Sequence, residues 1–214
     1  MAGAPVLERV KRNERARQAR RDEILAAARR VFAARGFGGT TIADIADEAK
    51  IALGTIYLYF ASKDDVFAAL NEQLIRLITD AITNVPPVET LESSVRARID
   101  NVFAACSANR DLVRLAVLNT DPGSAATKRM RRAEEVRNDP MVAGLERAMA
   151  AGTIREADAR IMTKLTYGFV SIAVYQAFVL SDGADADKYR QACSDMIIAY
   201  MTPQATGTDG AALV

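Results

Sequence analysis

The residues best suited to chemistry lie in the stretch TIADIADEAKIALGTIYLYFASKDDV, residues 41–66. Two short segments with apolar periodicity stand close together there, and the second ends in Tyr-Leu-Tyr-Phe followed directly by Ser-Lys-Asp-Asp. Phenol, hydroxyl and ammonium groups on so short a segment are groups that recognise a partner through hydrogen bonds. The cluster therefore either packs inside the protein or is pressed into a partner outside it.

The chain contains no histidine. This excludes Ser-His-Asp and Cys-His nucleophile pairs and most zinc sites, and no pattern supports the carboxylate-only sites that remain. The two cysteines, Cys106 and Cys193, form no CxxC pair, so we expect two buried thiols in a reduced interior. We expect a protein that is not an enzyme and that needs no cofactor and no metal.

Charge is distributed unevenly along the chain. Residues 1–63 hold 12 basic and 7 acidic side chains, whereas residues 64–214 hold 16 and 20, although the net charge is only +1. This asymmetry predicts a basic end that meets a polyanion. The early residues are charged and show no signal peptide, and the longest apolar run, residues 165–180, is too short for a membrane span. We therefore expect a cytoplasmic protein without a membrane partner.

Hydrophobic periodicity, few glycines and few prolines predict an all-α fold. Helices are expected over residues 22–35, 42–49, about 53–60, 63–84, 88–107 and 111–119. Three more are expected: one that ends at about Ala151, one from about 156 to 180, and one over 185–201. Gly36 is expected to end the first helix, Thr41 to cap the second, and Ser62 with Asp65 to form an acidic capping box for the fourth. The basic residues before Asp22 either extend the first helix or are disordered.

Three short helices near the N-terminus, with a tight turn between the second and third, predict a helix-turn-helix. The third helix must be anchored on one face and present the other to a major groove. Leu53, Ile56 and Phe60 are predicted to anchor it, with Tyr57 on the same inward face. Thr55, Leu58 and Tyr59 are predicted to face outward.

Residues 24–70, ILAAARRVFAARGFGGTTIADIADEAKIALGTIYLYFASKDDVFAAL, resemble the DNA-binding domain of TetR-type transcriptional repressors. The resemblance implies a basic N-terminal arm (1–21), a helix-turn-helix domain (22–66), a C-terminal helical bundle for ligand binding and dimerisation (67–202) and a flexible tail (203–214). It further implies a homodimer on a palindromic operator, released by a small, largely apolar ligand.

The resemblance also implies DNA contacts at Thr41, Thr55, Tyr57, Leu58, Tyr59 and Lys63. Thr41 would offer its hydroxyl and a helix N-terminus to a phosphate, and Lys63 would clamp another. Thr55 would contact the groove, the tyrosine hydroxyls would meet phosphates or base edges, and Leu58 would touch a thymine methyl. Two positions depart from the family pattern. Lys50 stands where glycine is usual, at a turn position that favours a positive φ, and Ala52 stands where a serine cap is usual.

The apolar stretch LTYGFVSIAVYQAFVL, residues 165–180, predicts a helix that is buried on all sides in the assembled protein. Within one subunit one side of this helix can face the core, and the other side then needs a partner. The last helix carries an apolar stripe, and the resemblance implies that the last two helices pair across a two-fold axis. It also implies a pocket, with candidate lining residues Phe103, Leu115, Leu118, Met141, Leu145, Tyr167, Ser171, Val174 and Phe178; the alternative for each is ordinary core. Arg98, Arg114 or Asn119 are candidate anchors for an acidic or carbonyl group.

Several alternatives stay open at this point. The basic arm, residues 9–21, either adds phosphate or minor-groove contacts or is a solvated charge run. The run RMRRAEEVR, residues 129–137, is interpreted either as the solvent-exposed face of a helix with i,i+4 charge pairs or as a second nucleic-acid-binding patch. Beside the repressor stand two other functions: a DNA-binding architectural or division-linked protein without a small-molecule switch, and a helical enzyme or lipid carrier, against which the missing histidine and the charge split argue.

Overall fold

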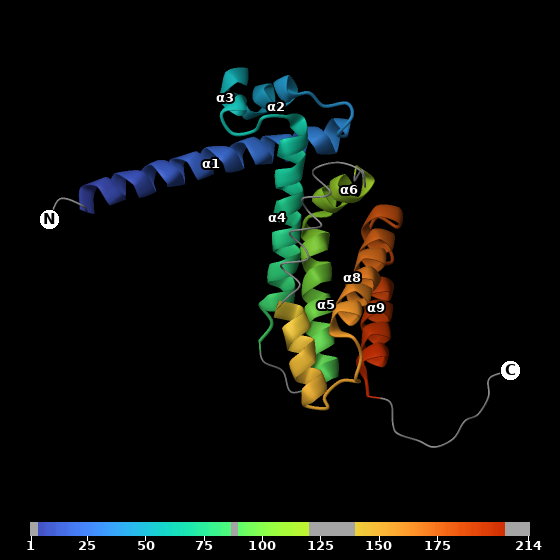
Figure 1. Cartoon of the computed structure of the whole chain (residues 1–214). Helices are drawn as coiled ribbons and strands as arrows, with labels where there is room; N and C mark the ends of the chain where they lie inside the picture. Colours follow the sequence, from blue (N-terminus) through green and yellow to red (C-terminus); the bar gives the residue numbers. More distant parts are fainter. Residues whose placement is uncertain (1–3, 87–89, 120–139, 204–214) are drawn as a thin grey trace, which may run out of the picture. The chain divides into compact units, whose positions relative to one another are not determined.

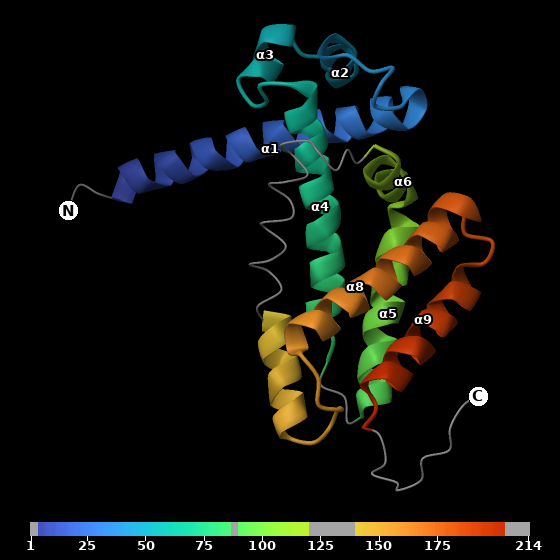
Figure 2. The same cartoon turned by 45° about the vertical axis from the view of Figure 1, so that its right-hand side comes forward.

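A computed structural model describes residues 4–86, 90–119 and 140–203, and every regular element in those ranges is a helix (Figures 1 and 2). The elements are α1 (Ala4–Arg35), α2 (Ile42–Ala49), α3 (Leu53–Tyr57), α4 (Lys63–Thr83), α5 (Leu91–Ala108), α6 (Arg110–Leu118), a helix over 140–150, α8 (Ala159–Tyr175), the π-helical η1 (Gln176–Leu180) and α9 (Ala186–Met201). The all-α prediction is confirmed. The run 129–137 and most of the predicted tail lie outside the described residues.

The chain divides into two compact units, residues 1–77 with 109–131, and residues 78–108 with 132–214. The first unit contains the N-terminal helices together with α6. Its core joins Ile24, Leu25 and Phe32 of α1 to Ile45 of α2 and Ile56 of α3, all buried. Phe37 packs between Phe32 and Phe67 with tilted rings, at ring-centroid distances of 5.6 and 5.0 Å, and so closes the loop after α1 onto α4.

The predicted helix boundaries in the first unit are largely confirmed. Gly36 adopts φ +70°, a left-handed conformation that glycine takes without steric cost, and its N–H bonds to the Phe32 carbonyl at 2.8 Å. Ser62 caps α4 by accepting from the Asp65 N–H at 3.2 Å and donating to the Asp65 carboxylate at 3.1 Å. The first helix, however, begins at Ala4, so the basic residues continue it and are not a separate segment.

Within the first unit, α6 is tied to α1 by charge. Arg29 donates through two nitrogens to the Asp111 carboxylate and through a third to the Asn109 side-chain oxygen at 3.1 Å. Both members of the ion pair are about one third exposed. The Arg29 hydrogen bonds hold the pKa of Asp111 below its ordinary value. Because the forked guanidinium matches a carboxylate, this pair fixes orientation as well as contact.

Replacing Asp111 by Asn is expected to destabilise the first unit by about 1 kcal/mol at neutral pH. A carboxyl whose pKa is depressed on folding stabilises the protein above its ordinary pKa of about 3.9 and loses that effect as pH falls through the lowered value. The free energies of unfolding of wild type and Asp111→Asn, measured with urea, should therefore differ at pH 7, and the difference should shrink as the pH falls below about 3.9. A difference that stays constant from pH 7 to pH 3 would contradict this assignment.

The second unit is built around α5, α8 and α9. Phe103 of α5 packs on Phe178 of η1 with ring centroids 5.7 Å apart, and both side chains are buried. Two ion pairs bridge α5 and α9, Arg96 with Asp195 at 2.9 Å and Arg190 with Asp100. Cys106 and Cys193 are free and buried, as predicted, and burial raises the pKa of their thiols to about 12 and about 11.

In the single chain α8 has one buried side and one exposed side, as expected for an apolar helix whose second side requires a partner. Ile161, Leu165, Ile172 and Leu180 are exposed, while Met162, Thr163 and Val174 are buried on the opposite side. The helix faces α5 and α9 on one side only, because one subunit supplies neighbours for only that side. No helix among the described residues is long and apolar enough to cross a membrane.

Candidate nucleic-acid interface

Thr41 opens α2 as its N-cap. Its hydroxyl accepts from the Asp44 N–H at 3.1 Å and donates to the Asp44 carboxylate at 2.7 Å, while the Thr41 N–H donates to the same carboxylate at 2.8 Å. The Thr41 hydrogen bonds lower the pKa of Asp44, and Arg35 beside it lowers that pKa further. Since the Thr41 hydroxyl proton is already shared inside the cap, the free N–H groups of the first helical turn are the donors best placed to meet a phosphate.

The turn between α2 and α3 depends on Lys50. This residue adopts φ 55°, ψ 44°, the left-handed conformation expected at that position, and its N–H bonds to the Asp47 carbonyl at 3.1 Å. A left-handed conformation costs a residue with a Cβ about 1–2 kcal/mol. Lys50 thus holds the turn under strain that a glycine at this position would not carry.

Replacing Lys50 by Gly is expected to raise the free energy of unfolding by about 0.5–1 kcal/mol, because relief of the left-handed strain exceeds the added entropy of the unfolded chain. Denaturant unfolding measures the gain. Lys50→Ala, which removes the same charge but retains a Cβ, is the matched control and should bring no comparable gain. Equal stabilities of the two variants would contradict the strain assignment.

The third helix is short and anchored by two residues. Ile56 is fully buried and Phe60, just after the helix, is 4% exposed. Leu53 and Tyr57, which were predicted to face inward, are 44% and 54% exposed, so that part of the prediction is wrong. A helix of five residues makes little more than one turn, and only positions near Ile56 reach the core.

The outward side of this segment is apolar and aromatic. Leu58 is 72% exposed and follows the exposed Tyr57, while Thr55 and Tyr59 are half-buried. Ala52 caps α3 without a side-chain hydrogen bond, as its residue type predicts, and the Thr55 N–H bonds to the Ala52 carbonyl at 2.8 Å. Exposed leucine and tyrosine side chains grouped on one short helix are typical of a contact surface.

Lys63 lies at the start of α4 and is engaged within the first unit. Its ammonium donates to the Phe37 carbonyl at 2.7 Å and to the Thr40 carbonyl at 2.9 Å, and lies 4.4 Å from the centroid of the Phe37 ring. An ammonium has three N–H donors, so one is left for an external phosphate. Lys63 therefore also positions the loop that leads to the Thr41 cap, a role that its sequence position did not indicate.

The candidate pocket residues are divided between the two units. Leu115, buried, and Leu118, exposed, lie on α6 in the first unit. In the second unit Phe103, Val174 and Phe178 are buried, Met141, Leu145 and Tyr167 are half-buried, and Ser171 is exposed. Of the candidate anchors, Arg98 donates to the Ser94 carbonyl at 2.9 Å and Asn119 to the Leu115 carbonyl at 3.0 Å.

Comparison with known proteins places these observations in a family. The model of "Bacterial regulatory proteins, tetR family" matches residues 24–70. The HTH-type transcriptional regulator HbdR of Aromatoleum sp. (strain CIB) is 30% identical over 155 residues, covering 71% of this chain and 67% of that regulator. The HTH-type transcriptional repressor KstR2 of Mycobacterium tuberculosis (strain ATCC 25618 / H37Rv) is 36% identical over 90 residues, covering 39% of this chain and 44% of the repressor.

Solved structures share the fold over most of the chain. The transcriptional regulator FadR from Bacillus subtilis, crystallised with stearoyl-CoA, superposes with a TM-score of 0.72 at 19% identity, covering 84% of this chain and 98% of that one. A TetR transcription regulator from Haloarcula marismortui ATCC 43049 gives the same TM-score at 24% identity, covering 86% and 100%. At these identities the likeness establishes the fold, an N-terminal helix-turn-helix followed by a helical domain.

Proposed function

This chain belongs to the TetR family of bacterial helix-turn-helix transcription regulators, and from that premise we propose that it is a homodimeric repressor of a palindromic operator, released by a small, largely apolar ligand. The observation that carries the proposal is the α2–α3 pair, in which Ile56 is buried and Tyr57 and Leu58 are exposed. This arrangement anchors the recognition helix while leaving its outer face for a major groove.

Within this proposal the six contact residues divide by role. Leu58 touches a thymine methyl and so reads bases, and Thr55 contacts the groove. Tyr57 and Tyr59 direct phenol hydroxyls at phosphates or base edges. Thr41 contributes the N-terminus of α2 to a phosphate, and the remaining N–H of Lys63 binds another.

Homodimerisation is supported by the exposed stripes of α8 and α9. Ile161, Leu165 and Ile172 recur on α8 at spacings of four and seven residues, so they lie on one side of the helix. On α9 the exposed Met196 lies between the exposed small residues Ala192 and Ala199, which allow another helix to approach closely. Two copies of this pair of helices bury both stripes in a four-helix interface, and the dimer then presents two recognition helices one turn of DNA apart.

The ligand-binding step is proposed for the helical domain. Its candidate lining is mainly aromatic and aliphatic, with Tyr167 and Ser171 as polar members, which suits an apolar ligand with one or two polar groups. Ligand binding would favour a dimer whose two DNA-binding units no longer fit the operator. By linkage, bound ligand lowers the affinity for DNA by the same factor as bound DNA lowers the affinity for the ligand. Stearoyl-CoA, the ligand in the FadR structure, is the first probe for displacement from DNA.

Selection of random duplex DNA by the purified full chain, followed by sequencing, tests the proposal. Enrichment of an inverted repeat, with half-sites centred about one helical turn apart, is the expected result. Binding to all duplexes alike, lost steeply with salt, would instead support an architectural DNA-binding protein. The enriched duplex then serves as the probe for every binding experiment below.

Leu58→Ala is expected to change base preference at one position of each half-site, because it removes the apolar contact with a thymine methyl. The expected cost at the preferred base is about 1 kcal/mol or more, with little change for the other bases. Repeating the selection with the variant measures it. Tyr57→Phe is the matched comparison: it removes a hydroxyl but no apolar contact, so it should weaken DNA binding and leave the preference at the position that Leu58 reads unchanged. An unaltered preference in Leu58→Ala would remove Leu58 from the reading residues.

A further inference from the structure

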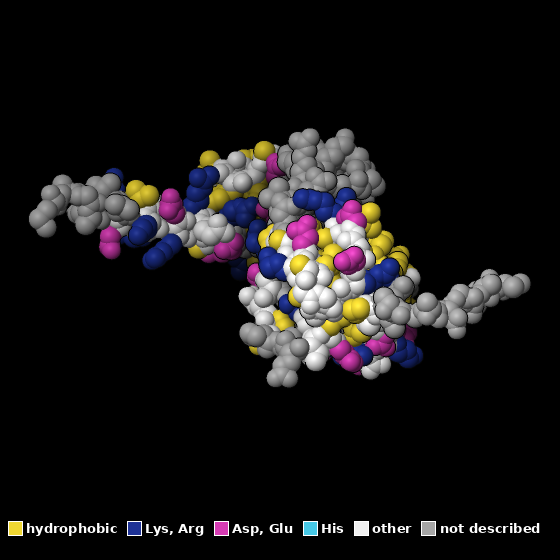
Figure 3. Space-filling view, turned by 60° about the horizontal axis from the view of Figure 1, so that its bottom comes forward, with side chains coloured by type: hydrophobic (Ala, Val, Ile, Leu, Met, Phe, Trp, Pro, Cys, Tyr) yellow, Lys and Arg dark blue, Asp and Glu magenta, His cyan; other side chains and the backbone are white. Residues whose placement is uncertain are grey.

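Residues 8–20 of α1, here called the arm helix, form an exposed basic helix. They carry six basic and two acidic side chains, and every one of the thirteen residues is exposed. Figure 3 shows dark-blue basic side chains along the N-terminal part of α1, at the left of the view. The basic side chains at 9–17 form no ion pair with any residue that the structure describes.

The arm helix has no core contact to hold it in place. It has no buried apolar stripe, and Val10 is 48% exposed. Lys11 and Arg15 are like charges four residues apart, an arrangement that destabilises an isolated helix. Helices of this length are marginal in water without packing. A polyanion laid along the arm helix would remove this repulsion and stabilise it.

We propose that the arm helix binds the phosphates of duplex DNA immediately outside the half-site that α3 reads, an inference that rests on the proposed function. The base of the arm is fixed beside the recognition segment, because the Arg21 guanidinium lies 5.1 Å from the centroid of the Phe60 ring. From there the N-terminal part of α1 continues on the side of α3 and away from α2 in both views (Figures 1 and 2).

The length of the arm helix suits a contact with flanking DNA. Thirteen residues at 1.5 Å each extend about 20 Å. At 3.4 Å per base pair this corresponds to about six base pairs of backbone. The contact therefore requires DNA beyond the sequence that α3 itself covers.

Helical geometry indicates which face of the arm meets DNA. Eighteen residues make five turns of an α-helix, so Arg12 is aligned with Arg30, which pairs with Glu48 of α2 at 2.6 Å. By the same spacing Lys11 is aligned with Arg29, which pairs with Asp111 of α6. The line through Arg12 therefore lies on the α2 side of α1, whereas the line through Lys11 lies on the α6 side.

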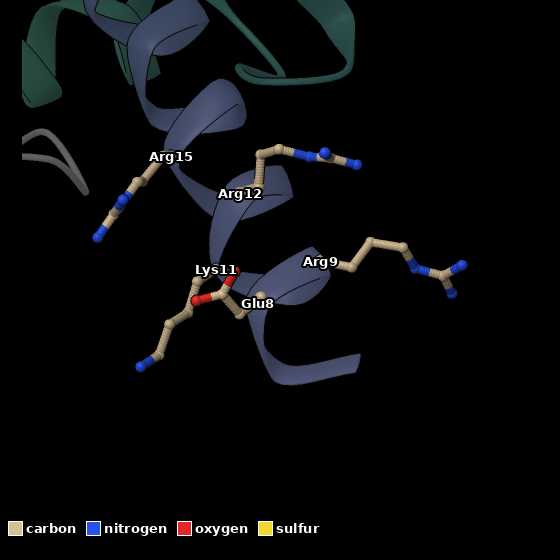
Figure 4. Close-up of a pocket in the computed structure, with 5 residues that line it drawn as sticks. All are labelled: Glu8, Arg9, Lys11, Arg12 and Arg15. Carbon is tan, nitrogen blue, oxygen red and sulfur yellow. The ribbon is translucent and has the colours of Figure 1, made fainter. Parts of the chain in front are cut away.

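The close-up of the arm agrees with this division. Figure 4 shows the side chains of Glu8, Arg9, Lys11, Arg12 and Arg15, with Arg9 and Arg12 directed to one side of the helix and Lys11 and Arg15 to the other. Glu8 lies beside Lys11 in this view. Arg9 and Arg12 thus lie on the side of α2, the helix whose first turn is proposed to meet a phosphate, and we take this side as the face directed to DNA. Lys11 and Arg15 provide a matched pair of equal charge on the other face.

The test compares two double variants of the full chain, R9Q/R12Q and K11Q/R15Q, on the selected operator with ten flanking base pairs on each side. Glutamine keeps the helix propensity and removes two charges in each case. For R9Q/R12Q the slope of log affinity against log salt should become shallower by about 1.8. The ratio of wild-type affinity to variant affinity should therefore fall about tenfold when the salt concentration rises from 50 to 200 mM. For K11Q/R15Q the slope should change by less than about 0.5.

A second comparison uses a duplex trimmed to the two half-sites. There R9Q/R12Q should bind like wild type, because the phosphates that its arginines contact are absent. Equal slopes for the two double variants, or a loss in R9Q/R12Q that persists on the trimmed duplex, would overturn the assignment. If instead the wild-type protein bound the selected sequence no better than other duplexes, the proposed function itself would be wrong. Failure of the arm assignment and failure of the proposed function are therefore distinguishable.

Anionic membranes are the competing partner for a basic helix. Phosphatidylserine vesicles distinguish it: binding of wild type but not R9Q/R12Q to vesicles, with unchanged DNA slopes, would assign the arm helix to a lipid surface and overturn the DNA proposal. The expected result is no vesicle binding at 150 mM salt together with the slope change on DNA.

Discussion

Ile172→Glu is expected to convert the dimer to a monomer of 23.1 kDa and to weaken operator binding by about a hundredfold or more. Ile172 lies at one end of the exposed α8 stripe and is 54% exposed in the single chain. In the proposed interface the variant would bury a carboxylate among apolar side chains, which costs several kcal/mol per charge. Loss of the second recognition helix removes an avidity that typically contributes 10² to 10⁴ in affinity.

Sedimentation and titration of the selected operator measure the two effects. Leu77→Glu on α4 is the control, since Leu77 is also an exposed aliphatic residue but lies outside the α8 and α9 stripes. It should leave the dimer intact. Met196→Lys, on the α9 stripe, should reproduce the effect of Ile172→Glu. A dimeric Ile172→Glu protein with wild-type affinity would show that subunits do not pair through α8.

The elements of the site that sequence predicts well are those encoded locally. Gly36, Thr41 and Ser62 each act on backbone groups within four residues, so their residue types alone indicate where helices end and begin. The left-handed Lys50 and the uncapped start at Ala52 are local in the same sense, and the structure bears out both. The TetR resemblance identified the family for the same reason, since its motif lies within residues 24–70.

Features that depend on partners distant in sequence were not predicted. Lys63 meets carbonyls 23 and 26 residues away, and Arg29 meets a carboxylate 82 residues away. No local pattern encodes such distances. Leu53 was misassigned because apolar periodicity marks a face but not where a short helix leaves the core.

Ile56→Ala is expected to reduce the free energy of unfolding of the first unit by about 2–4 kcal/mol and to weaken operator binding at least tenfold while leaving the dimer intact. Ile56 is fully buried, and the loss combines reduced burial with the cavity that remains. The five-residue α3 has only Ile56 within it in the core, so the cavity directly loosens the helix that carries Thr55, Tyr57 and Leu58. The α8 and α9 stripes belong to the other unit, and dimerisation should be unaffected.

Leu53→Ala on the same helix separates anchoring from contact. Because Leu53 is 44% exposed, its truncation should cost about 0.5 kcal/mol of stability or less. Urea unfolding and operator titration of both variants therefore give a clear pattern: a large stability loss with weaker binding for Ile56→Ala, and near-wild-type stability for Leu53→Ala. If Ile56→Ala kept wild-type stability and affinity, burial at position 56 would not be what holds the recognition helix in place, and the orientation of Tyr57 and Leu58 would have to depend on Phe60 and the turn at Lys50.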